Sequence, residues 1–368
     1  MPFPFCGEKK GGNIMKKILN FKLKIIIGLI FVLFLAVSAI GANENKPTKD
    51  EKKLFNLRAV NPPVDYLEFV TAWELGFFEE EGINIEFIGS LPTGMKDLQA
   101  IEQGIIDVSY SGHPSNIAQA RLAGIKVKLI QPGMIDTPKS PHVNYLVKKD
   151  SKLKTLDDLK GAKVGVSGIS VCTSGFVQYY LESAGFSKDD VEFITFATPG
   201  TQEQAVIQGD IDVTTSHTPY AEITLRTGEV RSIGTAYDIF KSAASGLGAR
   251  SLAERIINEY PEVAQGFVNA MYRARLWTND HFDEAGDLNA AVLGLQKGDV
   301  IAHYEDTNKN IDPEYLKIWF DIGLKIGLWN EKDITPEEIY TNQFVPKDAP
   351  AADKDLHWDG TPNRVFHR

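Results

Sequence analysis

The sequence predicts an α/β protein with two similar lobes, and three observations support this. A thirteen-residue segment nearly repeats itself: Gln99–Ser111 returns as Gln204–Ser216, with eight of thirteen positions identical. Strand and helix patterns alternate between residues 55 and 245, which is typical of α/β sheets with parallel strands. The chain has 368 residues, 43% of them apolar, which is enough for two domains. Two lobes built on one plan suggest a cleft between them, and a cleft suggests a ligand.

The first copy of the plan covers residues 54–130. Apolar residues at Phe69, Ala72 and Trp73 recur at helical spacing, so we expect Trp73 to pack in the core. Glycines follow several of the predicted helices, because glycine tolerates the turn that ends a helix. In order, we expect a strand at Leu54–Val60, a helix at Glu68–Glu80, a strand at Ile83–Ile88, a helix at Met95–Gln103, a buried strand at Ile105–Tyr110, a helix at Pro114–Ala123 and a strand at Val127–Ile130.

The second copy begins with a strand that crosses between the lobes, at Val143–Val147. Thr155 with Asp158, and Ser187 with Asp190, have the spacing of capping boxes, which start helical turns. Lys163–Val166 is expected to be a strand and Thr173–Ala184 a helix, followed by the second repeat. Beyond residue 250 the chain is mostly helical, with prolines at first helical positions in Asp312-Pro313 and Thr335-Pro336. The tail from Pro346 is expected to lie extended over the surface or to be loose.

The N-terminus has the pattern of an export signal. Four lysines between residues 16 and 24 precede an apolar run at Ile25–Ala36, and small residues then offer a cleavage site, so residues 1–42 are expected to be a signal peptide. A retained membrane anchor is the alternative, since the apolar stretch is near the minimum for spanning a bilayer. Lys9–Ile14 can be encoded by a purine-rich stretch that looks like a ribosome-binding site just upstream of Met15, which predicts that translation starts at Met15 and that residues 1–14 are not made.

Charge and cysteine content narrow the function classes. The net charge is −10, and no long basic run is present, which argues against nucleic acid as a partner. The two cysteines are Cys6, upstream of the signal, and Cys172, so no internal disulfide is expected. Cys172 is expected to be a small buried residue rather than a reactive thiol.

Four loops follow predicted strands, where ligands of α/β proteins bind. The glycine- and serine-rich loop Ser167–Gly175 enters a helix, and its free amides and hydroxyls favour an anion. Each loop can also be plain helix entry, with its hydroxyls capping the helix. The residues predicted to contact a ligand are Asn61 and Tyr66; Ser111, Gly112, His113 and Ser115; Ser170, Thr173 and Ser174; and Ser216, His217 and Thr218.

His113 and His217 raise the question of a metal or of acid–base catalysis. No third ligand and no carboxylate partner lies at a suitable sequence spacing from either histidine. We therefore expect neither a metal nor a cofactor nor a catalytic role, and favour hydrogen bonding to a ligand or a structural role. The sequence also leaves two roles open for Arg250: it can pair with an anionic group, or it can lie on the surface.

Several segments resemble one known family. Ala72–Phe87 is similar to its A-x-x-x-G-F-F-x-x-E-G signature, and Gln103–Gly112 to its glycine- and aspartate-containing strand and loop. Asp150–Val166 looks like its crossing segment, and Tyr260–Phe267 like a helix that follows the return to the first lobe. The family is the solute-binding proteins of ABC importers for nitrate, sulfonates, taurine and thiamine precursors.

The resemblance implies a type II periplasmic-binding fold, with two α/β lobes joined by a two-segment hinge. Lobe one would be residues 54–145 plus 246–345, lobe two residues 146–245, and residues 346–368 a C-terminal extension. The crossings near 143–148 and 241–250 would form the hinge, and closure would trap the solute between the lobes.

The resemblance also implies function. We expect the periplasmic, monomeric component of an ABC importer, which delivers a small solute to a permease and its ATPase. An organic anion such as a sulfonate or carboxylate is the expected solute. The alternatives are an enzyme on the same fold in thiamine-pyrimidine or menaquinone biosynthesis, against which the export signal argues, and a sensory or surface-anchored binder without an importer.

Overall fold

The structure is a computed structural model, and it describes residues 54–62, 66–89, 91, 95–110, 112–196, 198 and 200–366. The predicted signal peptide, the predicted start at Met15 and the candidate ligand residue Ser111 lie outside the described residues. The described residues all belong to one compact unit, Lys53–Arg368. None of the helices described is both long enough and apolar enough to cross a bilayer.

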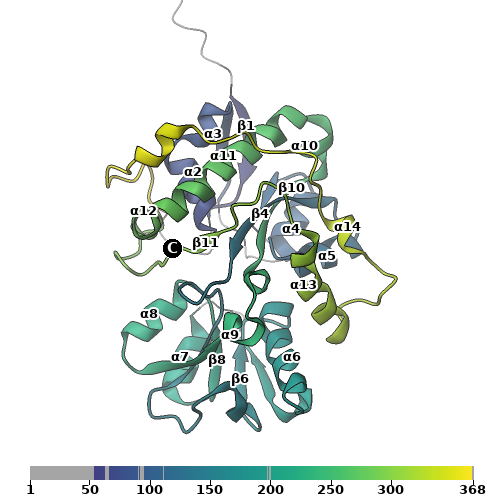
Figure 1. Cartoon of the computed structure of the whole chain (residues 1–368), viewed down its shortest axis with the longest axis vertical. Helices are drawn as coiled ribbons and strands as arrows, with labels where there is room; N and C mark the ends of the chain where they lie inside the picture. Colours follow the sequence, from purple (N-terminus) through teal and green to yellow (C-terminus); the bar gives the residue numbers. More distant parts are fainter. Residues whose placement is uncertain are drawn as a thin grey trace, which may run out of the picture. The chain divides into compact units, whose positions relative to one another are not determined.

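The order of strands and helices largely follows the predicted one (Figure 1). The strands are β1 (Phe55–Ala59), β2 (Ile83–Phe87), β3 (Val108–Ser109), β4 (Val127–Ile135), β5 (Asn144–Lys148), β6 (Lys163–Val166), β7 (Glu192–Thr195), β8 (Val213–Ser216), β9 (Val230–Thr235), β10 (Gly248–Ala253) and β11 (Tyr304–Glu305). The α-helices are α2 (Leu67–Glu74), α3 (Phe77–Glu80), α4 (Met95–Glu102), α5 (Pro114–Leu122), α6 (Phe176–Ser183), α7 (Thr201–Gln208), α8 (Tyr220–Arg226), α9 (Ala236–Phe240), α10 (Glu254–Glu259), α11 (Pro261–Asp280), α12 (Phe282–Val292), α13 (Pro313–Lys325) and α14 (Pro336–Ile339). Short helical turns lie at η1 (Leu156–Leu159), η2 (Val171–Gly175), η3 (Lys188–Asp190), η4 (Ala243–Gly246) and η5 (Ala351–Asp355).

Two sheets share one strand order. In the first, β1 pairs with β2, and the Asp107 amide donates to the Arg58 carbonyl at 2.8 Å, which joins β3 to β1. β10 then lies between β3 and β4, so the order is β2-β1-β3-β10-β4, with β11 at the edge. The second sheet has the order β7-β6-β8-β5-β9. We call the elements of the first sheet, with α2–α5 and α10–α14, lobe one, and β5–β9 with α6–α9 lobe two.

The sheets are mixed, so the expectation of all-parallel strands is wrong. β10 is antiparallel to β3 and β4, and β5 is antiparallel to β8 and β9. Both strands come directly after the chain has crossed from the other lobe. A strand that enters a sheet from the opposite end must run against its neighbours, so the chain crossings explain the antiparallel strands.

Several predicted elements are divided or shortened, among them the helix expected at Thr173–Ala184, which is η2 followed by α6. The helix expected at Glu68–Glu80 is two helices, because Gly76 adopts a left-handed φ of 77° between α2 and α3. Such a φ breaks the helical repeat, and glycine adopts it without strain. The strand expected at Ile105–Tyr110 is reduced to β3, with Ile105 exposed in the turn before it.

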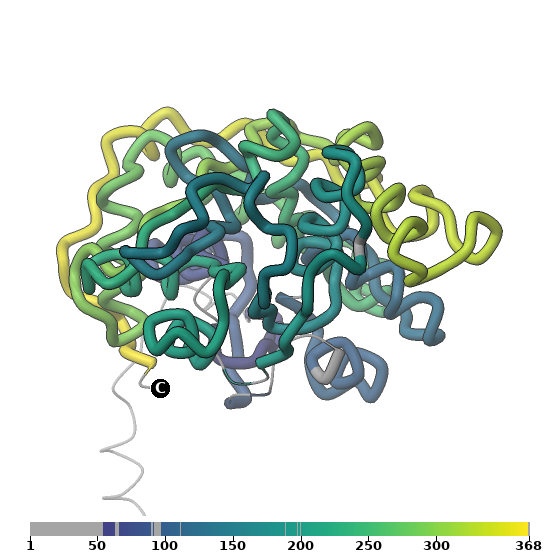
Figure 2. Tube along the Cα trace, turned by 90° about the horizontal axis from the view of Figure 1, so that it is seen from below, coloured from purple at the N-terminus to yellow at the C-terminus, as the bar shows by residue number. Residues whose placement is uncertain are grey.

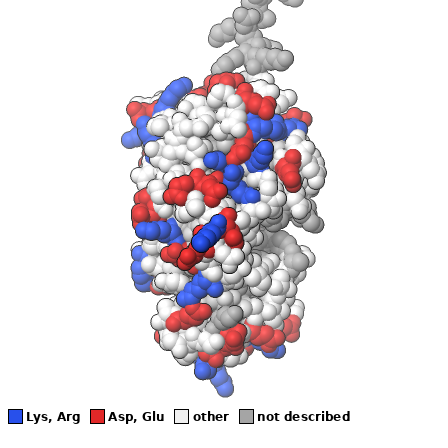
Figure 3. All heavy atoms as spheres, turned by 90° about the vertical axis from the view of Figure 1, so that its right-hand side faces the viewer, with Lys and Arg blue, Asp and Glu red and all other residues white. Residues whose placement is uncertain are grey.

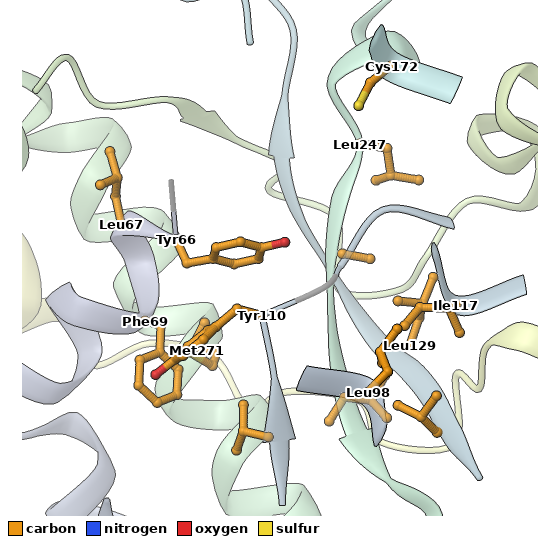
Figure 4. Close-up of a cluster of buried hydrophobic side chains, with 14 of the residues drawn as sticks. Tyr66, Leu67, Phe69, Leu98, Tyr110, Ile117, Leu129, Cys172, Leu247 and Met271 are labelled. Carbon is orange, nitrogen blue, oxygen red and sulfur yellow. The ribbon is translucent and has the colours of Figure 1, made fainter. Parts of the chain in front are cut away.

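Aromatic side chains fill the core of lobe one. Phe69 contacts Phe78, Tyr110 and Phe267, and Figure 4 shows Phe69 and Tyr110 side by side. Trp73 packs edge-on against Phe87, with ring centroids 5.2 Å apart, which confirms its predicted core role.

The C-terminal segment runs extended along lobe one, beside α11 and α12 (Figures 1 and 2). The indole of Trp277 donates to the Leu356 carbonyl at 2.8 Å, and Arg273 forms an ion pair with Asp353. Phe366 is buried against Trp73 and Phe87. Of the two expectations for this tail, the extended one is therefore confirmed for its described residues.

Candidate functional site

The candidate site forms where three predicted loops meet the first chain crossing. His113 starts α5 in lobe one, whereas Cys172 in η2 and His217 after β8 belong to lobe two. The fourth member, His142, lies between β4 and β5 and is absent from the residues predicted by sequence. The ring centroid of His142 lies 5.4 Å from that of His113 and 5.5 Å from that of His217.

Gly112 fixes the position of His113. A Cβ atom at Gly112 would lie 1.9 Å from the Ala249 carbonyl oxygen in β10, so only glycine permits this approach. The Nδ1–H of His113 donates to the Leu247 carbonyl at 3.0 Å, and its ring stacks on Trp319 with centroids 4.6 Å apart. The second crossing and β10, into which it leads, therefore determine both the place and the tautomer of His113.

Asp136 orients His142 in the interior. The His142 backbone amide donates to Asp136 Oδ1 at 2.6 Å, and its Nδ1 lies 3.3 Å from both carboxylate oxygens. Ser245 donates to Asp136 Oδ2 at 2.6 Å. Burial lowers the pKa of His142, but the charge and hydrogen bond of Asp136, with a smaller contribution from Cys172, outweigh it and raise this pKa to about 9. His142 is therefore an imidazolium at neutral pH, paired with an anionic Asp136.

The neighbouring histidines are neutral. Burial and the charge on His142 lower the pKa of His113 to about 3, and the same causes hold the pKa of His217 well below its usual range. His303, whose Nδ1 lies 3.3 Å from Ser140 Oγ, has its pKa lowered to about 4 by burial and by His142. Four of the seven histidines thus gather around one positive charge.

His113, His142 and Cys172 are close enough to act on one atom. One ligand atom from each of the three buried residues lies within 4.8 Å of the other two. His142 Nε2 is buried, and none of the described residues forms a hydrogen bond with it. No third ligand or carboxylate lies at a suitable sequence spacing from His113 or His217, yet the fold supplies both in space. The missing partners, His142 and Asp136, are distant from them in sequence, and only the fold brings them together.

The predicted hydroxyl groups mostly donate within their own lobe. Thr173 donates to the Gly168 carbonyl at 2.5 Å, and Ser174 to the Ser170 carbonyl at 3.3 Å. Ser216 donates to Glu203 at 2.6 Å, and Thr218 to Glu222 at 2.8 Å. The Ser170 hydroxyl lies 2.9 Å from that of Thr173 and 3.6 Å from Cys172 Sγ, and Ser115 is buried in α5. Each hydroxyl has one proton to donate, and most of these hydroxyls donate it within their own lobe. The imidazoles and the thiol are therefore the chemically distinctive groups of the site.

The predicted residues near the start of α2 lie deeper in lobe one. The Gly112 amide donates to the Tyr66 hydroxyl at 2.9 Å, and Figure 4 shows that side chain extended away from Phe69. The Arg250 guanidinium lies 4.5 Å over the Tyr66 ring and pairs with buried Glu68, so of the two roles left open for Arg250 the surface position is excluded. The Asn61 amide donates to the Gly89 carbonyl at 2.5 Å.

Contacts across the lobes enclose the cluster. Trp319 of α13 donates to the Ala244 carbonyl at 2.9 Å, and its ring centroid lies 5.5 Å from that of Phe176 in α6. Two ion pairs connect the lobes further out, Lys325 with Glu182 and Arg226 with Asp299. On the face drawn in Figure 3, the described acidic and basic side chains are interspersed, without a continuous basic patch.

Comparison with known proteins identifies relatives over most of the chain. The model of the NMT1/THI5 like family matches residues 64–285, more than half of the chain. A protein of Escherichia coli (strain K12) whose name assigns it to aliphatic sulfonates is 28% identical over 257 residues, covering 70% of this chain and 74% of its own. The riboflavin-binding protein RibY of Chloroflexus aurantiacus is 23% identical, covering 84% of this chain and 90% of its own.

A further relative is an enzyme. The 2'-hydroxybiphenyl-2-sulfinate desulfinase of Rhodococcus erythropolis is 22% identical over 290 residues, covering 63% of this chain and 74% of its own. Among solved structures, the periplasmic aliphatic sulphonate binding protein SsuA of Escherichia coli superimposes with a TM-score of 0.65 at 20% identity, covering 84% of this chain and 98% of its own. The predicted periplasmic-binding fold is thereby confirmed. The chain belongs to the NMT1/THI5-like family.

Proposed function

We propose that this protein is the extracytoplasmic substrate-binding component of an ABC importer, and that it captures a small organic anion such as a sulfonate or carboxylate between its lobes. It would act in the periplasm and deliver the solute to a membrane permease and its ATPase. Relatives that bind sulfonates or riboflavin support the solute-binding role.

One observation carries the choice of an anion. His142 is held as a buried imidazolium, and its Nε2 has no hydrogen-bond partner among the described residues. A buried donor without a partner is costly, and an anionic oxygen satisfies such a donor best because the bond is charge-assisted. The solute would thus contact His142 of the crossing segment and, at the same time, the loops of both lobes.

The position of the cluster also suits closure by ligand. A solute that contacts His113 of lobe one and His217 of lobe two binds the closed arrangement better than the open one. A ligand shifts a conformational equilibrium by its difference in affinity for the two states. The permease would then recognise the closed form.

Calorimetric titration tests the proposal. The panel contains taurine, alkane- and arylsulfonates, nitrate, aromatic carboxylates and riboflavin, with a neutral pyrimidine as the uncharged comparison. We expect an anion to bind, and His142→Gln to weaken its binding at least tenfold, because one charge-assisted hydrogen bond contributes about 1.5–3 kcal/mol. His281→Gln, outside the cluster, is the matched control and should bind normally. Binding of the pyrimidine alone would refute the anion class.

An enzyme is the second candidate, because Cys172 as nucleophile, the imidazolium of His142 as proton donor and Asp136 as orienting carboxylate lie next to one another in that order. The desulfinase relative makes aromatic sulfinates the first substrates to assay. Release of sulfite by the purified protein, abolished in Cys172→Ser, would establish an enzyme. Binding without any turnover would leave the receptor role.

A further inference from the structure

We propose that His113, His142 and Cys172 form a binding site for a divalent transition-metal ion of the zinc class, at the junction of the two lobes, with His217, whose ring neighbours that of His142, as the candidate fourth donor. This inference goes beyond the proposed function, since the site can hold its ion whether or not an organic anion binds.

The donor set is the first argument. Two imidazoles and one thiol are the ligands that zinc and related ions prefer, and their ligand atoms already lie within 4.8 Å of one another. All three residues are buried, so little of the site must be removed from water when an ion enters. The His217 ring lies beyond that of His142, with centroids 5.5 Å apart. Four-coordinate zinc needs one donor more than the three, and His217 can supply it.

The groups that accept hydrogen bonds from the histidine rings give an independent argument. Metal-binding histidines commonly donate their second ring N–H to a carboxylate or a backbone carbonyl, which turns the other nitrogen toward the ion. His142 donates from Nδ1 to Asp136, and His113 donates from Nδ1 to the Leu247 carbonyl. Nε2 is therefore the nitrogen left on each ring, and that of His142 is buried with no hydrogen-bond partner among the described residues.

Charge is also balanced at this place. Asp136 provides one negative charge behind His142, and Cys172 binds a metal as its thiolate, losing a proton. The proton on His142 is likewise displaced when the ion binds. A divalent cation is thus neutralised by one carboxylate and one thiolate, with neutral imidazoles completing its coordination.

The site connects the lobes. His113 comes from lobe one, Cys172 from lobe two and His142 from the crossing between them. An ion held by all three is retained only while the lobes are closed, so metal binding and closure must favour each other. The site is thereby distinguished from a structural ion within one domain.

The experiment uses the purified full chain after treatment with a chelator. We expect zinc chloride to bind with one ion per molecule and to raise the melting temperature, because the ion binds the folded state alone. Cobalt(II) should give the bands of a tetrahedral site together with a thiolate-to-cobalt charge-transfer band. Cys172→Ser should abolish the charge-transfer band, and Asp136→Asn should weaken zinc binding about 10–100-fold.

A second cluster provides the control. His281, Glu284 and His357 also have ligand atoms within 4.8 Å of one another, but they lie nearer the surface. His357→Ala should leave zinc affinity and the cobalt spectrum unchanged. If His357→Ala removes the ion and Cys172→Ser does not, the inference is overturned. It is also overturned if Cys172→Ser keeps the wild-type melting temperature without zinc and still binds the ion normally.

The two proposals fail separately. Anion titrations carried out in chelator test the receptor role without any metal, and zinc titrations without organic solute test the metal site. Anion binding with no zinc binding would overturn the metal site alone. Zinc binding with no response to any organic anion would support the site and refute the anion class.

Discussion

The two lobes place the same repeat in the same structural position, yet they differ in what surrounds it. In lobe one, the Asp107 carboxylate accepts from the Arg58 amide at 2.8 Å, and in lobe two the Asp212 carboxylate accepts from the Lys163 amide at 2.8 Å. The Asp107 and Asp212 amides return the bond to the carbonyls of the same partners, Arg58 and Lys163. One local motif, an aspartate that joins two adjacent strands, is therefore built twice.

The two lobes differ in how many charged side chains they bury. Among the described residues of lobe two, Glu203 is the one buried Asp, Glu, Lys or Arg. Lobe one buries ten such residues, including Asp107, Asp136, Arg250 and Glu305. Asp107 is buried between Arg58 and Arg255, whereas Asp212 is exposed. The comparison teaches that the repeat encodes a backbone connection, and that lobe one has added ion pairs to it.

The largest difference should appear when each aspartate is removed. Asp107→Ala leaves two guanidinium groups without their carboxylate and a strand amide without its acceptor, so we expect a loss of about 4 kcal/mol in the free energy of unfolding. Asp212→Ala removes an exposed carboxylate and should cost about 1 kcal/mol. Denaturant unfolding of both variants measures the two values. Equal costs would show that the added arginines contribute nothing.

The buried charges of lobe one should also make its stability depend on pH. Burial raises the pKa of Glu305 to about 7, opposed by Arg250 and Arg275 and assisted by Asp306. The folded state then holds a proton that the unfolded state has released above pH about 4.5. Stability from this group is present below that pH and is lost as pH rises toward 7, by about 3 kcal/mol.

Glu305→Gln should lose less stability than the wild type as pH rises through that window, because the glutamine cannot titrate and the contribution of Glu305 disappears. Unfolding by urea at several pH values between about 4.5 and 7 measures the slope. Glu337→Gln, which alters an exposed carboxylate of α14, is the control and should keep the wild-type slope. A Glu305→Gln profile with the same slope as the wild type would contradict the assignment to Glu305.

The third comparison concerns equivalent positions after the repeat, Gly112 in lobe one and His217 in lobe two. Gly112→Ala forces a Cβ atom against the Ala249 carbonyl, and we expect a cost of about 2 kcal/mol as α5 and β10 move apart. His217→Ala should cost less than about 1 kcal/mol, because it shortens a side chain that packs by one ring contact. Thermal unfolding ranks the two, and the reverse order would refute the steric argument.

The sequence predicted the elements well because their signals are local. Thr155 and Ser187 begin capping boxes as expected, and β6 has the predicted bounds. The repeat predicted two equivalent lobes, and both sheets have the same strand order. Periodicity did not reveal the break at Gly76, since a left-handed glycine leaves the apolar spacing on either side intact.

The candidate site was harder to predict from the sequence than the strands and helices were. His113 and His217 follow strands of the repeat, where their positions identified them, and both reach the cluster. His142 and Asp136 follow no recognisable motif, and their role arises because the chain crosses between lobes at this place. The hydroxyls of Ser216 and Thr218 were predicted to face a ligand, whereas each donates to a nearby glutamate, a choice that depends on side-chain rotamers.

The smallest effect is expected from the ion pairs that connect the lobes. Lys325 with Glu182, and Arg226 with Asp299, are partly exposed, so each should contribute no more than about 0.5 kcal/mol. Lys325→Ala and Arg226→Ala should therefore leave unfolding almost unchanged at high salt, where exposed pairs are screened, and cost slightly more at low salt. Lys317→Ala breaks a pair within α13 and is the matched control. A loss above about 1.5 kcal/mol for either interlobe variant alone would mean that surface charge, rather than the buried cluster around His142, holds the lobes together.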